Sequence, residues 1–512
     1  MNVSADLYNL IHSLSRNEKR YISLSILQNS KNEYFRLFKM LEKQKHFNEK
    51  ALHTLMQKEK SSKKLPVLKA YLKEYILKKL NSFYYKSSVE ITLQQSLMET
   101  DILLKKQFFV QGKKKLIKIK RLADKNEEFE ILLQCIKREK KILRSIYRPS
   151  NENSWNRLLK EEISLTKKID NFNRYDWLSG KLSNYYNTVG QDIRTKYQKE
   201  KIRRILRHPL LKNTKGLLSK AAKLRYHHLR SLCYYFLLEY QNALESNKAF
   251  LTLIEPRVFS NEQTVIPYLG ALNNRINILL RLKDYSNAAV NIELIRNSIK
   301  MTSSGGVISE QMLRRNFIIS YAHQLNLLLG SGQYKKALEL IPLVEQIIRK
   351  YSNGIENEIL MPFYYIFSYL HFVWGNYRQT LLNLHKIINK QMDETQVRED
   401  VYSYSKLLYV LTYIELYGEE VPENLIKSTY EFLVKRKHLL KAEYVFLRFI
   451  RNKFLRPQEP GEVIQELRKL KRQMIQLQDN SYEKSSLKYF DFLAWIESKI
   501  HKTSFLEQLK KQ

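Results

Sequence analysis

The sequence feature that most constrains the fold is a short pattern that recurs four times between residues 240 and 380. A tyrosine is followed three residues later by a small residue, and successive tyrosines are 45, 49 and 43 residues apart. The four pairs are Tyr240 and Ala243, Tyr285 and Ala288, Tyr334 and Ala337, and Tyr377 and Thr380. Gly332 and Gly375 each stand two residues before one of these tyrosines. A repeat of this period predicts an array of structural units.

Each tyrosine lies between two apolar stretches of helical periodicity, such as residues 321–329 and 338–348. We expect the tyrosine to pack in the elbow between two helices, while the small residue allows the second helix to approach the first. One such hairpin cannot bury its own apolar faces, so neighbouring hairpins must stack. The alternative is a chance recurrence in a chain that contains 34 tyrosines.

The scarcity of turn-forming residues favours helices over sheets. The chain has 13 glycines and 10 prolines in 512 residues, whereas average usage is about 7% and 5%. A sheet protein of this length needs turn signals every ten or so positions. We therefore expect an all-α fold made of αα-hairpin repeats. Its predicted parts are a basic helical N-terminal region at 1–150, the repeat array at 151–457 and capping helices at 458–512.

At the recurring residues the chain resembles the tetratricopeptide repeat family. Gly332, Tyr334 and Ala337 are similar to the turn and the second-helix start of that repeat. Ser231 and Ser368 occupy the position at which the family prefers a small residue in the first helix. The resemblance covers about residues 220–390. It implies a right-handed superhelix of helix pairs with a concave groove that binds peptides.

The chain also departs from this family. Its repeat spacing exceeds the usual 34 residues of the family, and Ile276 and Leu325 stand where Gly or Ala is expected. A weaker echo of the pattern, Phe109 followed by Gly112, predicts a similar elbow in the first half of the chain. The ligand of a repeat protein is not inherited with its fold.

The C-terminal segment carries a different apolar spacing. Val463, Leu467, Leu470, Met474 and Leu477 follow the pattern of a coiled-coil seam over about two heptads. The segment therefore predicts either a coiled-coil contact with a partner or a capping helix packed on the end of the array. The short length favours the capping helix.

Positive charge is concentrated in the first half of the chain. Residues 1–230 contain 52 Lys and Arg against 22 Asp and Glu, a net charge of +30, whereas residues 231–512 contain 37 against 29, a net charge of +8. Two clusters are densest, and residues 201–238 contain no acidic residue. The candidate polyanion-binding residues are Lys113, Lys114, Lys115, Lys118, Arg121, Lys201, Arg203, Arg204 and Arg207. Such clusters predict contacts with phosphates or another polyanion, although a solvated basic face is the alternative.

Aromatic residues accompany the second cluster, at Tyr197, Tyr226, Tyr234 and Tyr235. Exposed tyrosines could stack on single-stranded bases. Aromatic residues at helical spacing are more often part of a core, and no helix-turn-helix, RRM or zinc-finger signature supports nucleic-acid binding.

The sequence contains no pattern that predicts catalysis or a cofactor. It lacks the glycine-rich phosphate loops, the zinc-protease motif and the nucleophile-elbow motif. The adjacent His227 and His228 project about 100° apart on a helix, so we expect interhelical contacts and no metal site. Cys135 and Cys233 are predicted to be buried. We expect a protein that is not an enzyme and has no cofactor.

The N-terminus does not predict a secretory signal, because residues 1–20 begin polar and lack a basic start followed by an apolar core. No stretch reaches the roughly 20 apolar residues of a membrane-spanning helix. These patterns predict a cytoplasmic protein without membrane insertion.

Two functions follow from these patterns. The first is a scaffold or regulatory adaptor that binds a protein or peptide in a concave groove formed by the first helices of the hairpins. The second is an RNA- or DNA-binding protein that uses its basic N-terminal half. The sequence leaves the oligomeric state open.

Overall fold

A computed structural model describes most of the chain. The described residues are 3–28, 32–44, 46–57, 65–84, 89–145, 151–189, 195–254, 262–303, 310–351, 357–389, 398–435, 440–454, 460–478, 483 and 489–511. Within these ranges the chain forms helices and short turns and no β-strand, which confirms the predicted all-α class. Residues 150, 457 and 458 lie outside the described ranges, so the domain boundaries placed there stay predictions.

The chain divides into two compact units. The first comprises residues 1–169, 257–266 and 299–314, and the second comprises residues 170–256, 267–298 and 315–512. Each unit is built from helices that contact their neighbours in sequence.

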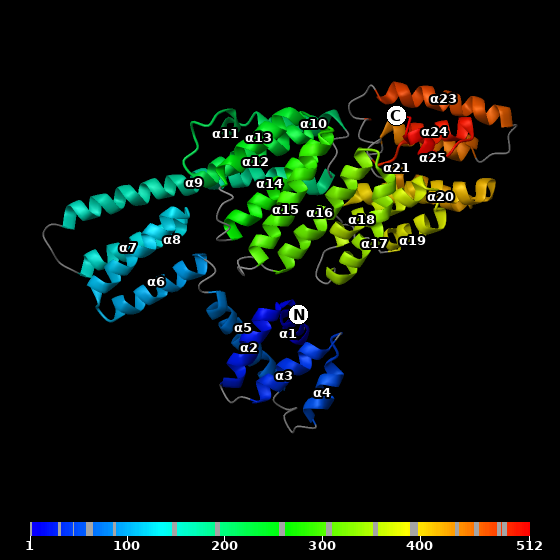
Figure 1. The fold of residues 1–512 in the computed structure, drawn as a ribbon. Coiled ribbons are helices and arrows are strands. Elements are labelled where there is room, and N and C mark those ends of the chain that lie inside the picture. Colours follow the sequence, from blue (N-terminus) through cyan, green and yellow to red (C-terminus); the bar gives the residue numbers. More distant parts are fainter. Residues whose placement is uncertain are drawn as a thin grey trace. The chain divides into compact units, whose positions relative to one another are not determined.

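The first five helices of the first unit enclose a core of their own. They are α1 (Val3–Ser13), α2 (Arg16–Gln28), α3 (Asn32–Lys43), α4 (Glu49–Gln57) and α5 (Leu65–Tyr84) (Figure 1). Apolar residues spaced along each helix, among them Leu7, Ile22, Phe38 and Leu72, are fully buried in it. The Tyr75 hydroxyl of α5 donates a hydrogen bond of 2.8 Å to the Ser25 carbonyl of α2.

A second core in this unit lies among four further helices. They are α6 (Val89–Lys105), α7 (Phe109–Lys125), α8 (Phe129–Ser145) and the first part of α9 (Asn151–Val189). Helix α7 contacts both α6 and α8. The core residues include Leu97, Leu116, Ile136 and Leu158, one from each helix.

The chain continues with ten helices, whose residues belong to the second unit except for parts of three of them. The ten helices are α10 (Lys196–Leu206), α11 (Pro209–Lys212), α12 (Lys220–Phe236), α13 (Tyr240–Leu253), α14 (Glu262–Arg281), α15 (Tyr285–Ser303), α16 (Glu310–Gly330), α17 (Tyr334–Tyr351), α18 (Asn357–Val373) and α19 (Tyr377–Ile388). The pairs α12–α13, α14–α15, α16–α17 and α18–α19 are the predicted hairpins.

All four predicted elbow tyrosines are the first residues of the second helix in a pair: Tyr240 of α13, Tyr285 of α15, Tyr334 of α17 and Tyr377 of α19. Phe109 begins α7 in the same way, so the weaker echo in the first half also marks an elbow. A sixth elbow, which the sequence pattern missed, precedes Phe129 of α8.

The six elbows share one backbone conformation. Two residues before each aromatic residue the chain has a positive φ, between 56° and 74°, at Gln107, Glu127, Leu238, Lys283, Gly332 and Gly375. In each elbow the N–H just before the aromatic residue donates a hydrogen bond of 2.8–2.9 Å to the carbonyl five residues earlier, as from Asn376 to His371. This left-handed cap satisfies the last carbonyls of the first helix.

Buried residues recur at two fixed positions of each predicted hairpin. The residue three positions after the tyrosine (Ala243, Ala288, Ala337 or Thr380) is fully buried. The residue nine positions before it is Ser231, Ile276, Leu325 or Ser368, each at most 2% exposed. Ile276 and Leu325, which stand where the tetratricopeptide family has Gly or Ala, are therefore buried like the serines at the same position.

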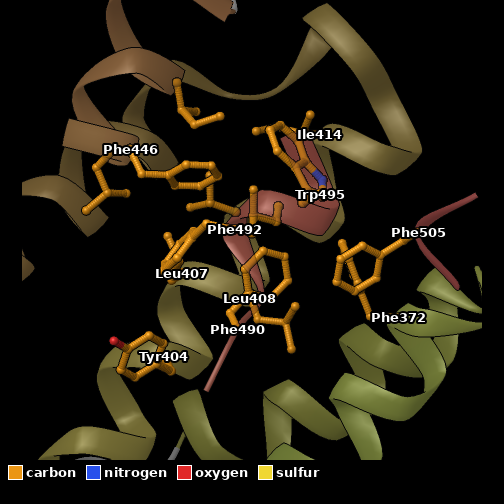
Figure 2. Close-up of a cluster of buried hydrophobic side chains, with 14 of the residues drawn as sticks. Phe372, Tyr404, Leu407, Leu408, Ile414, Phe446, Phe490, Phe492, Trp495 and Phe505 are labelled. Carbon is orange, nitrogen blue, oxygen red and sulfur yellow. The ribbon is translucent and has the colours of Figure 1, made fainter. Parts of the chain in front are cut away.

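The C-terminal helices enclose a further core, to which α18 and α19 also contribute. These C-terminal helices are α20 (Glu399–Tyr417), α21 (Glu423–Lys435), α22 (Lys441–Phe449), α23 (Pro460–Gln478), α24 (Phe492–His501) and α25 (Phe505–Leu509), with short turns at Gly418–Glu420 and Ile450–Phe454. Figure 2 shows Phe446, Phe492 and Trp495 packed together in this core. Glu415 accepts hydrogen bonds from Trp495 Nε1 at 2.8 Å and from Lys499 Nζ at 2.6 Å.

Helix α23 packs within its own chain. Leu467, Leu470 and Met474 are buried in the C-terminal core, and α23 contacts both α22 and α24. Neighbouring helices of the same chain thus cover the apolar side of α23, as the capping-helix alternative predicts.

Successive helix contacts and repeated elbows are consistent with an α-solenoid. Among the helices that the structure describes, none combines the length and apolar character needed to cross a bilayer.

Candidate binding surfaces

The first basic cluster lies on α7, where one side is buried and the other is exposed. Gly112, Leu116, Ile119 and Ala123 form the buried side. A Cβ atom on Gly112 would lie 2.8 Å from Cδ2 of Leu104, so the absence of a side chain allows α7 to approach α6 closely.

The predicted cations of α7 do not act as one group. Lys113, Lys114, Lys118 and Arg121 are exposed, whereas Lys115 is partly buried and forms an ion pair with Glu99 of α6. Four of the five predicted residues therefore remain available on the surface.

Lys120, which was not among the candidates, is part of the packing. Its Nζ lies 3.0 Å from Glu139 of α8 and 2.7 Å from Glu161 of α9. Burial disfavours the charged amine, but the hydrogen bonds that Lys120 donates to Glu161 and Glu139, with their negative charge, outweigh this effect and raise the pKa of Lys120. The sequence alone could not separate this lysine from its exposed neighbours.

The second basic cluster lies on α10. Lys201, Arg204 and Arg207 are exposed, and Arg203 is partly buried. Arg207 contacts Glu200 at 3.3 Å. A capping box of Thr195 and Gln198 fixes the start of this helix.

Two later cations of the acid-free segment 201–238 have structural contacts. Arg225 contacts Asp176 of α9 at 3.1 Å. Arg230 donates hydrogen bonds to the Leu211 carbonyl at 2.9 Å and to the Tyr234 hydroxyl at 2.7 Å. These arginines join α12 to its neighbours.

The four tyrosines near α10 also differ in how far they are exposed. Tyr226 is buried in the core of α9–α12, and Tyr235 is packed against Tyr240 at the elbow of α12 and α13. Tyr197 is 65% exposed, and Lys201 Nζ lies 4.7 Å from the centre of its ring. Tyr234 is partly buried, with Arg230 Cζ 5.1 Å from its ring centre, so Tyr197 is the one exposed ring of the four.

A cavity of about 320 Å³ lies between the second half of α9 and the first helices α12 and α14. Its polar lining consists of Ser183, His228, Ser231, Tyr235, Asn274 and Asn277, and its apolar lining consists of Leu182, Leu232, Phe236 and Ile278. None of these ten residues is Lys, Arg, Asp or Glu. Its volume falls at the small end of ligand sites.

The polar groups of the cavity are suited to an uncharged ligand. Burial lowers the pKa of His228 to about 4, and Arg225 contributes to the shift, so the imidazole is neutral at neutral pH. The carboxamides of Asn274 and Asn277 have no hydrogen-bond partner among the described residues. A carboxamide offers both donors and an acceptor.

A buried polar chain continues along the first helices beyond the cavity. Asn273 of α14 donates a hydrogen bond of 3.2 Å to Asn316 of α16, and its Oδ1 lies 3.0 Å from His323 Nε2. Burial lowers the pKa of His323 to about 4. Polar residues on α12, α14 and α16 thus lie on first helices, where the sequence analysis expected a binding face.

The histidine pair packs against neighbouring aromatic rings, and the two cysteines are buried. His228 packs against Phe250 of α13, with ring centres 5.9 Å apart, and His227 contacts the ring of Tyr226 edge-on. Cys135 and Cys233 are buried free thiols whose pKa burial raises to about 12. Among the described residues no three His, Cys, Asp or Glu side chains gather as metal ligands.

No protein-family model matches the chain, and no curated protein matches its sequence significantly. The resemblance to tetratricopeptide repeats therefore depends on the elbow residues and helix packing of this chain.

Proposed function

We propose that the protein is an intracellular, non-catalytic scaffold of tetratricopeptide-like type that binds a protein or peptide segment along its first helices. The observation that supports this most is the cavity lined by α12 and α14, where the carboxamides of Asn274 and Asn277 have no partner in the part of the chain that the structure describes. Carboxamides pair well with the alternating N–H and C=O groups of a peptide backbone. The apolar residues Leu232 and Ile278 complete the contact surface.

Affinity purification of the full chain from its native cell tests this function. A variant with Asn274→Arg and Asn277→Arg fills the cavity with two long cations, whereas Val290→Arg adds a cation at an exposed position of the second helix α15. Proteins that the parent and Val290→Arg retain, and the cavity variant loses, would be ligands of the cavity. Identical partner sets for all three forms would contradict the proposal.

Nucleic-acid binding at α10 is the second candidate, because Tyr197 is exposed beside Lys201. Base stacking on the open ring and phosphate contacts from Lys201 and Arg204 would act together. Binding of a fluorescent single-stranded RNA should weaken steeply with salt and should be reduced by Tyr197→Ala. Binding unaffected by that substitution would argue against this candidate.

A further inference from the structure

The side of α7 that faces away from its core combines cations with aliphatic side chains. At about 100° per residue, the direction opposite the buried residues of α7 contains six positions. These form what we call the α7 outer face: Val110, Lys114, Ile117, Lys118, Arg121 and Lys125. All six are exposed, and Val110 is 68% exposed.

The four cations of the α7 outer face have no acidic partner among the described residues. This distinguishes them from Lys115 and Lys120, which point toward neighbouring helices and are paired with Glu99, Glu139 and Glu161. From Lys114 to Lys125 the cations extend over about 16 Å of helix.

Exposed apolar residues are also present on the neighbouring helix α6. Helices α6 and α7 lie side by side (Figure 1). The ion pair between Glu99 and Lys115 joins the two helices. Met98 and Ile102, which lie next to Glu99 on α6, are 64% and 55% exposed. Phe108, at the elbow between the helices, is also exposed.

We propose that the α7 outer face, together with Met98 and Ile102, binds the surface of an anionic lipid bilayer. The headgroup phosphates of such a bilayer neutralise lysine and arginine, and the boundary of its acyl chains accepts aliphatic and phenyl side chains. A bilayer surface would therefore bind both the cations and the aliphatic side chains of this face. The contact is peripheral and needs no helix that crosses the membrane.

A nucleic acid would satisfy only part of this surface. Phosphates would pair with Lys114, Lys118 and Arg121, but Val110 and Ile117 would lie against a charged backbone. The six positions of the face include no aromatic residue on which a base could stack. The membrane is therefore the partner that the surface fits best, independently of any peptide bound at the cavity.

Vesicle sedimentation of the full chain tests this proposal with four forms of the protein. A charge variant combines Lys114→Glu, Lys118→Glu and Arg121→Glu, and an apolar variant combines Val110→Ser and Ile117→Ser. A control variant combines Lys212→Glu, Lys215→Glu and Lys223→Glu, three exposed cations between the start of α11 and the first turn of α12, so it has the same net charge as the charge variant. Circular dichroism first establishes that all variants retain the helicity and melting temperature of the parent.

The expected result is binding of the parent to vesicles with one-third phosphatidylglycerol and little binding to pure phosphatidylcholine. Since each cation near an anionic surface contributes about fivefold to partitioning, the charge variant should lose about a hundredfold or more. The apolar variant should lose about tenfold, and the control variant should lose clearly less than the charge variant.

Three outcomes would overturn the proposal. The parent could fail to bind anionic vesicles, or the charge and control variants could lose equally, which would indicate a nonspecific effect of net charge. The third outcome comes from parallel binding assays with single-stranded RNA and with an acidic peptide. In it, the charge and apolar variants weaken binding of the RNA or the peptide but leave vesicle binding unchanged. The face would then be a nucleic-acid or protein contact.

Discussion

The Ser231 hydroxyl of α12 donates a hydrogen bond of 2.9 Å to the Ala243 carbonyl of α13. Both residues are buried. They occupy the positions nine before and three after the elbow tyrosine, which are buried in every predicted hairpin. The bond also lies next to the cavity, since Ser231 is one of its lining residues. Helix pairing and the shape of the candidate site are therefore linked at this residue.

Enlarging Ser231 should destabilise the helix pair. Ser231→Leu removes the hydrogen bond and forces a larger side chain between α12 and α13, so we expect a loss of about 1–3 kcal/mol in the free energy of unfolding. Urea denaturation measures it. Gln241→Leu, at an exposed position of α13, serves as the control and should change stability by less than about 0.5 kcal/mol. Equal stability of the two variants would mean that the crossing is not close.

Because the elbows share one conformation, removing a glycine from one elbow and introducing a glycine at another should have opposite effects on stability. Gly332 has a φ of 72° and Lys283 a φ of 59°, and this region costs a side chain about 1 kcal/mol. Gly332→Ala should therefore lower the melting temperature, whereas Lys283→Gly should leave it unchanged or raise it. A lower melting temperature for Lys283→Gly would show that this elbow is not left-handed.

The ion pairs of α7 should differ in strength because they differ in burial. The Glu139 and Lys120 side chains are 12% and 19% exposed, and Lys120→Ala leaves two carboxylates without their cation, so we expect a loss of about 2 kcal/mol. The Lys115 and Glu99 pair is more exposed, and Lys115→Ala should cost less than about 1 kcal/mol. Comparison of the two variants by urea denaturation checks the ranking.

The buried histidines predict lower stability in acid. The pKa of His323 in the folded protein is about 4, below the roughly 6.5 of an unfolded chain. The unfolded state therefore binds more protons as the pH falls from about 6.5 to about 4, and the folded state loses stability over that range. His323→Gln should lose less stability than the parent between pH 7 and pH 5. His228 would still contribute to the loss that remains.

The elbows could be predicted because their signal is local. An aromatic residue, a small residue three positions later and flanking apolar periodicity all fall within one stretch of sequence, and the four tyrosines lie where that pattern indicated. Leu238 and Lys283 carry no such signal, because a left-handed residue that is not glycine does not stand out in a sequence. Phe129 was missed because Leu132 stands where the pattern requires a small residue.

The candidate sites could be predicted only in part, because they depend on distant residues. The exposed Lys114 and the paired Lys120 look alike in sequence, and the partner Glu161 is 41 residues from Lys120. The cavity joins Ser183, His228 and Asn277 from three helices. The polar residues Asn273, Asn274 and Asn277 of a first helix were the available signal, and their meaning depends on what packs around them.

Site-specific photo-crosslinking in the native cell tests most directly whether the first helices bind a partner. A photoreactive amino acid replaces Asn277 in the cavity or, in a matched protein, the exposed Val290 on the second helix α15. We predict that a discrete protein partner crosslinks at position 277 and not at position 290. The same partner at both positions, or crosslinks at position 290 alone, would contradict a binding face on the first helices.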